Sequence, residues 1–270
     1  MLRAIKQFAR LFMSDEPPRI HCLFPRTTNN LNALDWCNGI LGRDFPITSL
    51  SSLDQLHHCK ATKPPAHEFL LVYFTINVNG LLYKIGMIVD RCPAKEIDKL
   101  PNDTSAPSFI VSPSPMPSPS PSPSIERLQA SLGKAGKSVA ATDRVMIPRF
   151  GRQDELKALA TETFGTYDTL NSLFIDNDHA SMSASQFATL VEIVHNLAPV
   201  YDLRKHQCYW FAFIIFLVVR DKTGGRESNG HKIELRGTWW YFTPEHSACD
   251  DEKVAKDEYD KARNQLNVGR

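Results

Sequence analysis

The apolar and polar positions of the chain form their clearest pattern between residues 68 and 90. Residues 68–78 (EFLLVYFTINV) and 81–90 (LLYKIGMIVD) are rich in β-branched and aromatic residues, and Asn79-Gly80 separates them. This pattern predicts a β-hairpin with a two-residue turn, because such a turn needs positive φ at both central positions and Asn-Gly tolerates that. The first run is apolar on both faces, which predicts a central strand covered from both sides.

Two further patterns predict helices in the last third of the chain. Residues 183–196 open with Ser-Ala-Ser-Gln, which fits a capping box, and continue with apolar residues at helical spacing until Pro199. Residues 209–219 form an apolar run without a charged residue, so a helix from Cys208 to Arg220 is expected to be buried on all sides. The run is much shorter than the ~20 residues of a membrane-spanning helix.

The remaining segments carry weaker signals. Residues 15–63 predict mixed loop and short helix, with a loop at Asn29-Asn30 and a short helix over 31–41. Residues 143–148 predict a strand, 153–164 a helix, 232–242 a strand or strand pair broken at Gly237, and 250–266 a charged, solvated helix.

Residues 112–124 (SPSPMPSPSPSPS) cannot bury apolar area and offer few backbone donors, so we interpret about 101–141 as a disordered insertion. The expected fold class is therefore α+β, an antiparallel sheet packed with helices. We divide the chain into an N-terminal amphipathic segment (1–20), one α+β domain (21–246) and a charged C-terminal helix (247–270).

Composition narrows the class of protein further. The chain is 42% hydrophobic and 23% charged with a net charge of +1, which is typical of a globular protein and gives no basic stripe for nucleic acid. Its six cysteines are scattered and form no C-x-x-C pair, so we expect reduced thiols in the cytosol or nucleus and no zinc site. The acid-free N-terminus leaves a mitochondrial address open beside a helix docked on the domain. No cofactor, metal or transmembrane segment is predicted.

Cys208 is the candidate nucleophile. If residues 208–220 form a helix, the thiol lies in its first turn, where unpaired N–H groups and the helix dipole favour a thiolate. His67 opens the first hairpin strand. Counting back from the Asn-Gly turn pairs Phe69 with Asp90 and makes His67 and Asp90 diagonal neighbours on one face, so Asp90 could orient His67 as the base for Cys208.

Simpler interpretations stand beside this one. A cysteine at the start of an apolar helix is commonly a small buried residue, and Asp90-Arg91 would be a surface ion pair. His57-His58-Cys59 has the look of a metal-site fragment and Asp176-Asn177-Asp178-His179 that of a calcium loop, but neither has the ligands to complete it, so surface loops are expected. The aromatic run 239–241 (WWY) suits a core or domain edge, or a binding groove.

The chain resembles a fungal protein family without an assigned activity. The resemblance rests on His67-Glu68, Asp90-Arg91, the Pro/Ser-rich insertion, Tyr201 and Cys208-Tyr-Trp-Phe, where Gln207 replaces the usual Asn. The motif pattern of the chain is also distantly similar to circularly permuted papain-like folds, of the lecithin retinol acyltransferase-like and PPPDE type. The resemblance implies Cys208 as nucleophile and His67 as base, although a second histidine usual on the following strand in the first type is missing here.

These observations favour a thiol-dependent hydrolase or acyltransferase that attacks an amide, ester or thioester carbonyl through Cys208. The first alternative is a non-catalytic binding module, with a protein partner and a structural Cys208. The second is a redox sensor in which Cys208 is oxidised.

Overall fold

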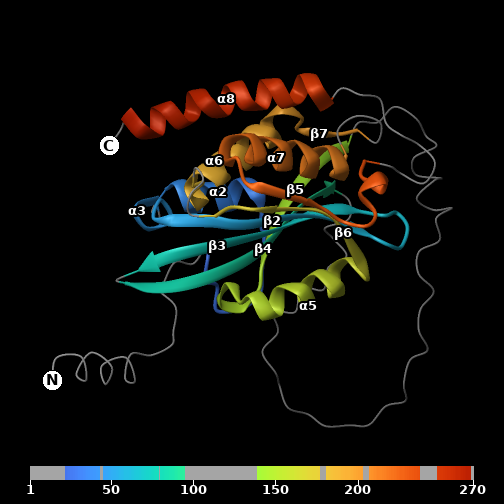
Figure 1. Cartoon of the computed structure of the whole chain (residues 1–270), viewed down its shortest axis with the longest axis horizontal. Coiled ribbons are helices and arrows are strands. Elements are labelled where there is room, and N and C mark those ends of the chain that lie inside the picture. Colours follow the sequence, from blue (N-terminus) through green and yellow to red (C-terminus); the bar gives the residue numbers. More distant parts are fainter. Residues whose placement is uncertain are drawn as a thin grey trace, which may run out of the picture.

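The computed structural model describes residues 22–42, 45–78, 80–94, 139–176, 181–202, 207–237 and 248–268. The described part is a mixed α+β fold built on an antiparallel sheet, which confirms the predicted fold class at that level (Figure 1). Four sequence features lie outside the described residues: the amphipathic segment 1–20, the Ser/Pro tract, residues 177–179 of the candidate calcium loop and the aromatic run 239–241.

The sheet has eight strands within the described ranges. They lie in the order β1-β5-β4-β3-β2-β6-β8, with β7 paired to β5, and each neighbouring pair is antiparallel. The strands are β1 (Asn29–Asn32), β2 (Ser51–Ala61), β3 (Glu68–Val78), β4 (Leu81–Pro93), β5 (Val139–Ile147), β6 (Tyr167–Phe174), β7 (Val200–Tyr201) and β8 (Arg226–Asn229).

The β3–β4 hairpin has the register that the Asn-Gly turn predicts. Val78 pairs with Leu81 and Phe69 with Asp90, without a bulge between them. Gly80 has a φ of +82°, a conformation that glycine adopts without strain. β3 lies between β2 and β4 and is buried along most of its length, which confirms the predicted central strand.

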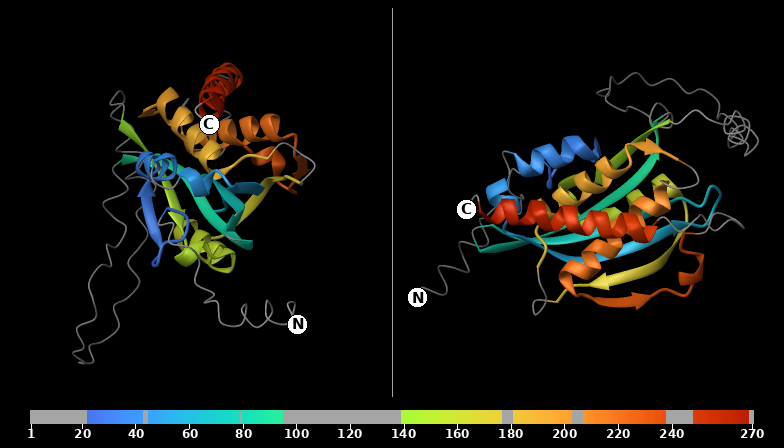
Figure 2. Two further views of the ribbon diagram at one scale, coloured as in Figure 1. Left: turned by 90° about the vertical axis from the view of Figure 1, so that its left-hand side faces the viewer. Right: turned by 90° about the horizontal axis from the view of Figure 1, so that it is seen from above.

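Helices cover both faces of the sheet unequally. They are α2 (Ala33–Leu41), α3 (Phe45–Thr48), α5 (Gln153–Phe164), α6 (Ala184–Leu197), α7 (Cys208–Thr223) and α8 (Ala248–Val268), with short 3₁₀ turns at Arg149–Gly151 and Ile233–Leu235. Helices α2, α6 and α7 pack on one face and α8 lies outside them, whereas α5 covers the other face (Figures 1 and 2).

This arrangement creates two hydrophobic cores. The larger core lies between the sheet and α2, α6 and α7, and takes Leu70, Val72 and Phe74 from β3. The smaller core lies under α5 and takes the alternate residues of the same strand. Because successive strand residues point to opposite faces, adjacent residues of β3 and β4 serve different cores.

The two best-predicted helices form as expected. Ser183 and Gln186 make the reciprocal hydrogen bonds of a capping box at the start of α6. α7 begins at Cys208 and is almost wholly buried, from Trp210 to Val219, and it ends at Gly224 in the left-handed conformation.

Three predictions for the less patterned segments are wrong. Residues 29–32 form β1 and residues 51–61 form β2, although loop and short helix were expected. Both gain their structure from strand partners far away in the sequence, β5 for β1 and β3 and β6 for β2. Residues 233–235 form a 3₁₀ turn rather than a strand, and residues 238–242 lie outside the described part.

The predicted limit of the disordered insertion is also wrong at its end. β5 begins at Val139, so residues 139–141 belong to a strand. Ala141 pairs with Pro93 of β4, and its N–H donates to the Pro199 carbonyl. Strand β5 therefore begins inside the range 101–141 that was interpreted as disordered.

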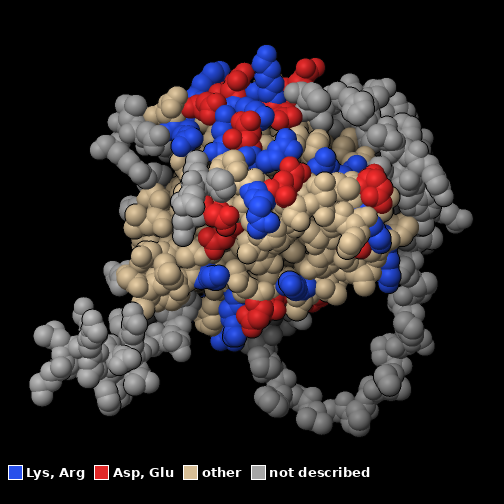
Figure 3. All heavy atoms as spheres, viewed as in Figure 1, with Lys and Arg blue, Asp and Glu red and all other residues tan. Residues whose placement is uncertain are grey.

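The sequence predicted a charged, solvated helix at the C-terminus. Helix α8 is charged, but one side of it is buried. Its Ala255 and Tyr259 are buried against the layer beneath, while Lys256 forms ion pairs with Glu252 and Asp221. Side chains of both charge signs crowd over this helix in Figure 3. None of the helices in the described ranges combines the length and the apolar character that crossing a bilayer requires.

Candidate active site at the N-terminus of α7

Cys208 is the first residue of α7. Its neighbour Gln207 is the N-cap but makes no side-chain capping bond, and the Phe211 N–H closes the first turn on the Gln207 carbonyl at 3.2 Å. As a residue, Cys208 is partly exposed. Its thiol lies at the positive end of a buried helix, where negative charge is stabilised.

His67 lies immediately before β3. Its backbone carbonyl accepts a hydrogen bond from the Ala61 N–H of β2, which fixes the start of the strand. Its ring stacks on Phe164, the last residue of α5, with centroids 5.1 Å apart, and its side chain is 17% exposed. The imidazole is thus held in one orientation while one edge stays accessible.

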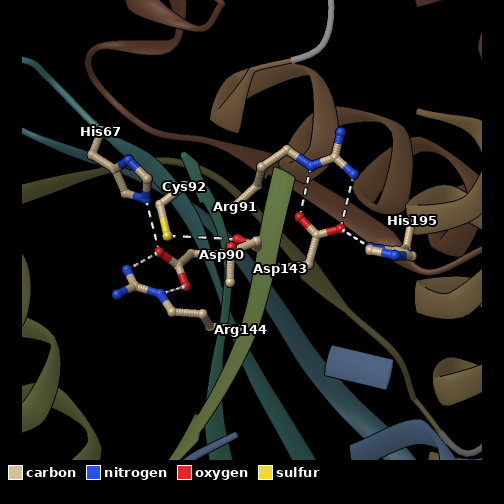
Figure 4. Close-up of polar contacts among 8 residues, drawn as sticks. His67, Asp90, Arg91, Cys92, Asp143, Arg144 and His195 are labelled. Atoms are coloured by element: carbon tan, nitrogen blue, oxygen red, sulfur yellow. Dashed lines mark hydrogen bonds and ion pairs between the residues drawn. The ribbon is translucent and has the colours of Figure 1, made fainter. Parts of the chain in front are cut away.

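Asp90 holds His67 as the hairpin register predicts. The His67 Nε2 lies 3.0 Å from Asp90 Oδ2 (Figure 4). Asp90 also accepts two hydrogen bonds from Arg144 of β5, from Nε at 3.0 Å and from Nη2. Burial would raise the pKa of this carboxyl, but Arg144 and His67 lower it to about 2. Asp90 is therefore an anion at every ordinary pH.

His67 and Cys208 interact directly. Because Nε2 of His67 faces Asp90, Nδ1 is the nitrogen that remains for the thiol. Burial of His67 would lower its pKa, but the negative charge of Cys208 and the bonds to Asp90 and Cys208 raise the pKa to about 10. The imidazole is therefore protonated at neutral pH.

The Cys208 thiol responds in the opposite direction. Burial would raise its pKa, but the charge of His67 and a hydrogen bond from the imidazole outweigh burial and lower the pKa below its ordinary value. A further hydrogen bond from the Glu68 backbone N–H also favours the thiolate. Both shifts favour an imidazolium beside a thiolate, the activated form of a cysteine nucleophile.

The Glu68 side chain is a nearby charge that opposes this thiolate. It is buried and lies 2.8 Å from His58 Nε2 and 2.9 Å from Lys60 Nζ, both of β2. Its Oε1 also accepts the Gly237 N–H at 3.0 Å. Burial would raise the pKa of Glu68, but His58 and Lys60 lower it. The carboxylate is therefore largely balanced by its own partners.

A second charged group lies on the other face of the same strands. It shows that the surface ion pair expected between Asp90 and Arg91 is wrong. Arg91 is fully buried and donates to Asp143 of β5, from Nε at 2.6 Å and Nη2 at 2.8 Å. His195 Nδ1 of α6 lies 2.7 Å from the same carboxylate (Figure 4). Asp90 and Arg91 thus pair with β5 on opposite faces and not with each other.

Sequence reasoning missed Arg91, Asp143, Arg144 and His195. One signal was available: Asp143-Arg144 places two charges in an otherwise apolar strand segment, as Asp90-Arg91 does in β4. Two such dipeptides on antiparallel strands indicate cross-strand ion pairs.

The described residues of the His57-His58-Cys59 run do not form a metal site. His57, His58 and Cys59 lie within β2, not in the surface loop that was expected, and His58 and Cys59 are fully buried. Their side chains point alternately to the two faces, and His57 pairs with Ser172 at 2.7 Å. Within the described ranges, no three His, Cys, Asp or Glu side chains are placed to share a metal ion.

Two surface hollows formed by described residues lie away from Cys208. One of about 500 Å³ is lined by β6, β8 and the turn that follows β8. The other, of about 370 Å³, is polar and lies beside α5, with His57, Tyr73 and Lys84 among its lining residues. Neither includes a residue of the Cys208–His67–Asp90 group.

Comparison of the chain with protein-family models, with curated proteins and with solved structures found no match.

Proposed function

We propose that the protein is a thiol-dependent hydrolase or acyltransferase in which Cys208 is the nucleophile, His67 the acid and base, and Asp90 the residue that orients His67. The observation that carries this proposal is the Asp90–His67 hydrogen bond, together with the opposite pKa shifts that His67 and Cys208 impose on each other at the start of α7. A nucleophile, a base and an orienting group within hydrogen-bond reach are what acyl transfer through cysteine requires.

In the first half of the reaction, the Cys208 thiolate attacks the carbonyl carbon of an amide, ester or thioester. The carbonyl π electrons move to oxygen and give a tetrahedral intermediate. When this collapses, the bond to the leaving group breaks and the leaving group takes the proton of the His67 imidazolium. The products are a thioester on Cys208 and a neutral His67, still held by Asp90.

In the second half, neutral His67 removes a proton from water or from a second acceptor. The activated oxygen or nitrogen attacks the thioester carbonyl, and Cys208 leaves as the thiolate beside the re-formed imidazolium. Water as acceptor makes the protein a hydrolase, and another nucleophile makes it an acyltransferase. The buried negative charge of Asp90 stabilises the protonated His67 at both stages.

The order of the site residues supports a permuted papain-like arrangement as the finer description of the fold. His67 precedes a central strand and comes before the helical Cys208 in the chain. In the folds that the sequence resembles, a strand histidine likewise comes before a cysteine at a helix N-terminus. The use of Nδ1 toward sulfur and Nε2 toward the orienting group is compatible with the same role for His67.

An acyl-trapping experiment tests the proposal. The full-length protein is mixed with p-nitrophenyl butyrate and with an alkyl thioester, and its mass is followed by intact and peptide-resolved mass spectrometry. We expect a burst of leaving group equal to the enzyme and an acyl adduct on Cys208. The adduct should be absent from Cys208→Ala and much slower to form in His67→Ala. Adduct formation that survives Cys208→Ala, or no adduct with either reagent, would overturn the proposal.

A second candidate function is a non-catalytic binding module with a structural Cys208. It is favoured by the position of the two described hollows, both away from the thiol. In that case wild-type Cys208 would titrate as an ordinary thiol and form no acyl adduct, so the same experiment separates the two functions.

A further inference from the structure

Strands β4 and β5 carry two charged dipeptides in direct opposition. Asp90 pairs with Arg144 and Arg91 with Asp143 in the strand register. Because adjacent residues point to opposite faces, one ion pair faces α5 and the other faces α7. Each arginine donates from both Nε and Nη2 to its aspartate, which fixes the plane of each guanidinium (Figure 4).

On the α7 face, Arg91 contacts the first turn of the helix. Its guanidinium carbon lies 5.1 Å from the centre of the Trp210 ring and 4.8 Å from the centre of the Phe211 ring. Among the described residues, Arg91 Nη1 has no hydrogen-bond acceptor. The aromatic faces take the place of an acceptor, as a buried arginine beside two rings allows.

This contact is tied to the thiol by the helix itself. Trp210 and Phe211 lie two and three residues after Cys208, and the Phe211 N–H closes the turn that contains Cys208. Trp210 is held from the opposite side, because its Nε1–H donates to Asp251 of α8 at 3.0 Å. A shift of Arg91 would therefore move the turn that carries the sulfur.

The other ion pair ends at the partner of that sulfur. Arg144 fixes Asp90, and Asp90 fixes the His67 ring that contacts Cys208. The dipeptides of β4 and β5 thus reach the two members of the Cys–His pair by separate paths, one on each face of the sheet.

We propose that Arg91 is a positioning residue for Cys208, which holds the first turn of α7 at the distance from His67 where thiolate and imidazolium pair. The inference rests on the proposed function and deepens it, since it assigns part of the activation of the thiol to a residue that never touches the substrate. Asp143 supports this role by fixing Arg91 from β5.

A purely structural Arg91 would behave differently from a positioning one. Removing one partner of a buried ion pair lowers stability in either case, so unfolding alone does not discriminate. The discriminating readout is the pH at which Cys208 becomes a thiolate, measured as the rate of iodoacetamide labelling of the Cys208 peptide in the folded protein.

The main test variant is Arg91→Met with Asp143→Asn, which removes both charges together and leaves neither stranded in the interior. We expect the midpoint of Cys208 labelling to rise by about one pH unit, and labelling at pH 6 to fall about tenfold. Arg91→Lys keeps the charge but not the planar contacts, so it should give an intermediate midpoint.

Val218→Ala is the matched control, because it removes buried volume from the same helix far from the first turn. It should lower stability and leave the labelling midpoint unchanged. A midpoint that stays at the wild-type value in the folded double variant would overturn the positioning role. So would an equal shift in Val218→Ala, because the effect would then be general loosening of α7.

The wild-type protein and His67→Ala, measured alongside, separate this inference from the proposed function. If wild-type Cys208 titrates as an ordinary thiol and His67→Ala changes nothing, the proposed function fails and the inference with it. If wild-type Cys208 has a low midpoint that His67→Ala raises, but the double variant does not, only the role of Arg91 fails.

Discussion

The two faces of the sheet carry the same three residue types in the same order, yet they differ in chemistry. On the α5 face, Arg144, Asp90 and His67 are joined, and on the helical face Arg91, Asp143 and His195. The histidines are similarly exposed, 17% for His67 and 13% for His195. An Asp–His pair alone therefore does not mark a thiol site in this molecule, because of these two histidines only His67 lowers the pKa of a thiol.

The pKa values of Cys208 and Cys37, one cysteine for each face, shift in opposite directions. The pKa of Cys208 is lowered, since the charge of His67 outweighs the cost of burial. Cys37 of α2 lies on the other face and donates to the Ala188 carbonyl at 3.2 Å. Burial, together with the negative charges of Glu192 and Asp143, raises its pKa. Burial thus opposes ionisation of both thiols, and only at Cys208 does the charge of an adjacent imidazole outweigh it.

The largest effect expected from this comparison follows the loss of Asp143. Asp143→Ala leaves Arg91 fully buried without its carboxylate, which should cost about 3–5 kcal/mol of unfolding free energy. Asp90→Ala should cost less, because Arg144 and His67 each reach solvent in part. Urea denaturation at pH 7 measures both. Equal losses of unfolding free energy would contradict the expectation that Asp143→Ala is the more destabilising of the two variants.

Asp90→Asn should remove part of the acid dependence of stability. The pKa of Asp90 falls from 3.8 to about 2 on folding, so its contribution is present above the unfolded value and lost as pH falls through about 2. The shift corresponds to about 2–3 kcal/mol. Between about pH 4 and about pH 2, wild-type stability should fall more steeply than that of the variant. Parallel pH profiles would contradict the lowered pKa.

The smallest expected effect is that of shortening the segment between β4 and β5. Deletion of residues 105–124 removes a Ser/Pro-rich stretch that cannot bury apolar area, so the melting temperature should hardly change. The Cys208 labelling profile should also be unchanged, because the ion pairs of β4 and β5 remain. A large fall in melting temperature would show that the stretch packs against the domain.

The sequence predicted those features that depend on local pattern. The Asn-Gly turn sets the register of β3 and β4, and the register brings Asp90 to His67. The apolar run after Cys208 predicts a buried helix, and α7 is one. The catalytic roles of Cys208, His67 and Asp90 remain predictions.

The features that sequence reasoning missed depend on partners far along the chain. β2 was overlooked because its polar residues hide the strand pattern, and the partners that bury Lys60, Glu68 among them, are not evident from the sequence of β2. Arg91 was assigned to the surface because a single charged dipeptide gives no sign of its partner. Its partner Asp143 lies beyond the Ser/Pro-rich segment, in a strand whose position in the sheet no local pattern specifies.

The most direct test of the account is the pH profile of Cys208 alkylation in the wild type, His67→Ala and His195→Ala. Peptide-resolved mass spectrometry gives the labelling rate of Cys208 at each pH. We expect a wild-type midpoint well below the ordinary thiol value of about 8.5, a clear rise in His67→Ala, and no change in His195→Ala, which removes the equivalent histidine on the other face. An ordinary thiol profile in all three proteins would contradict the thiolate–imidazolium pair.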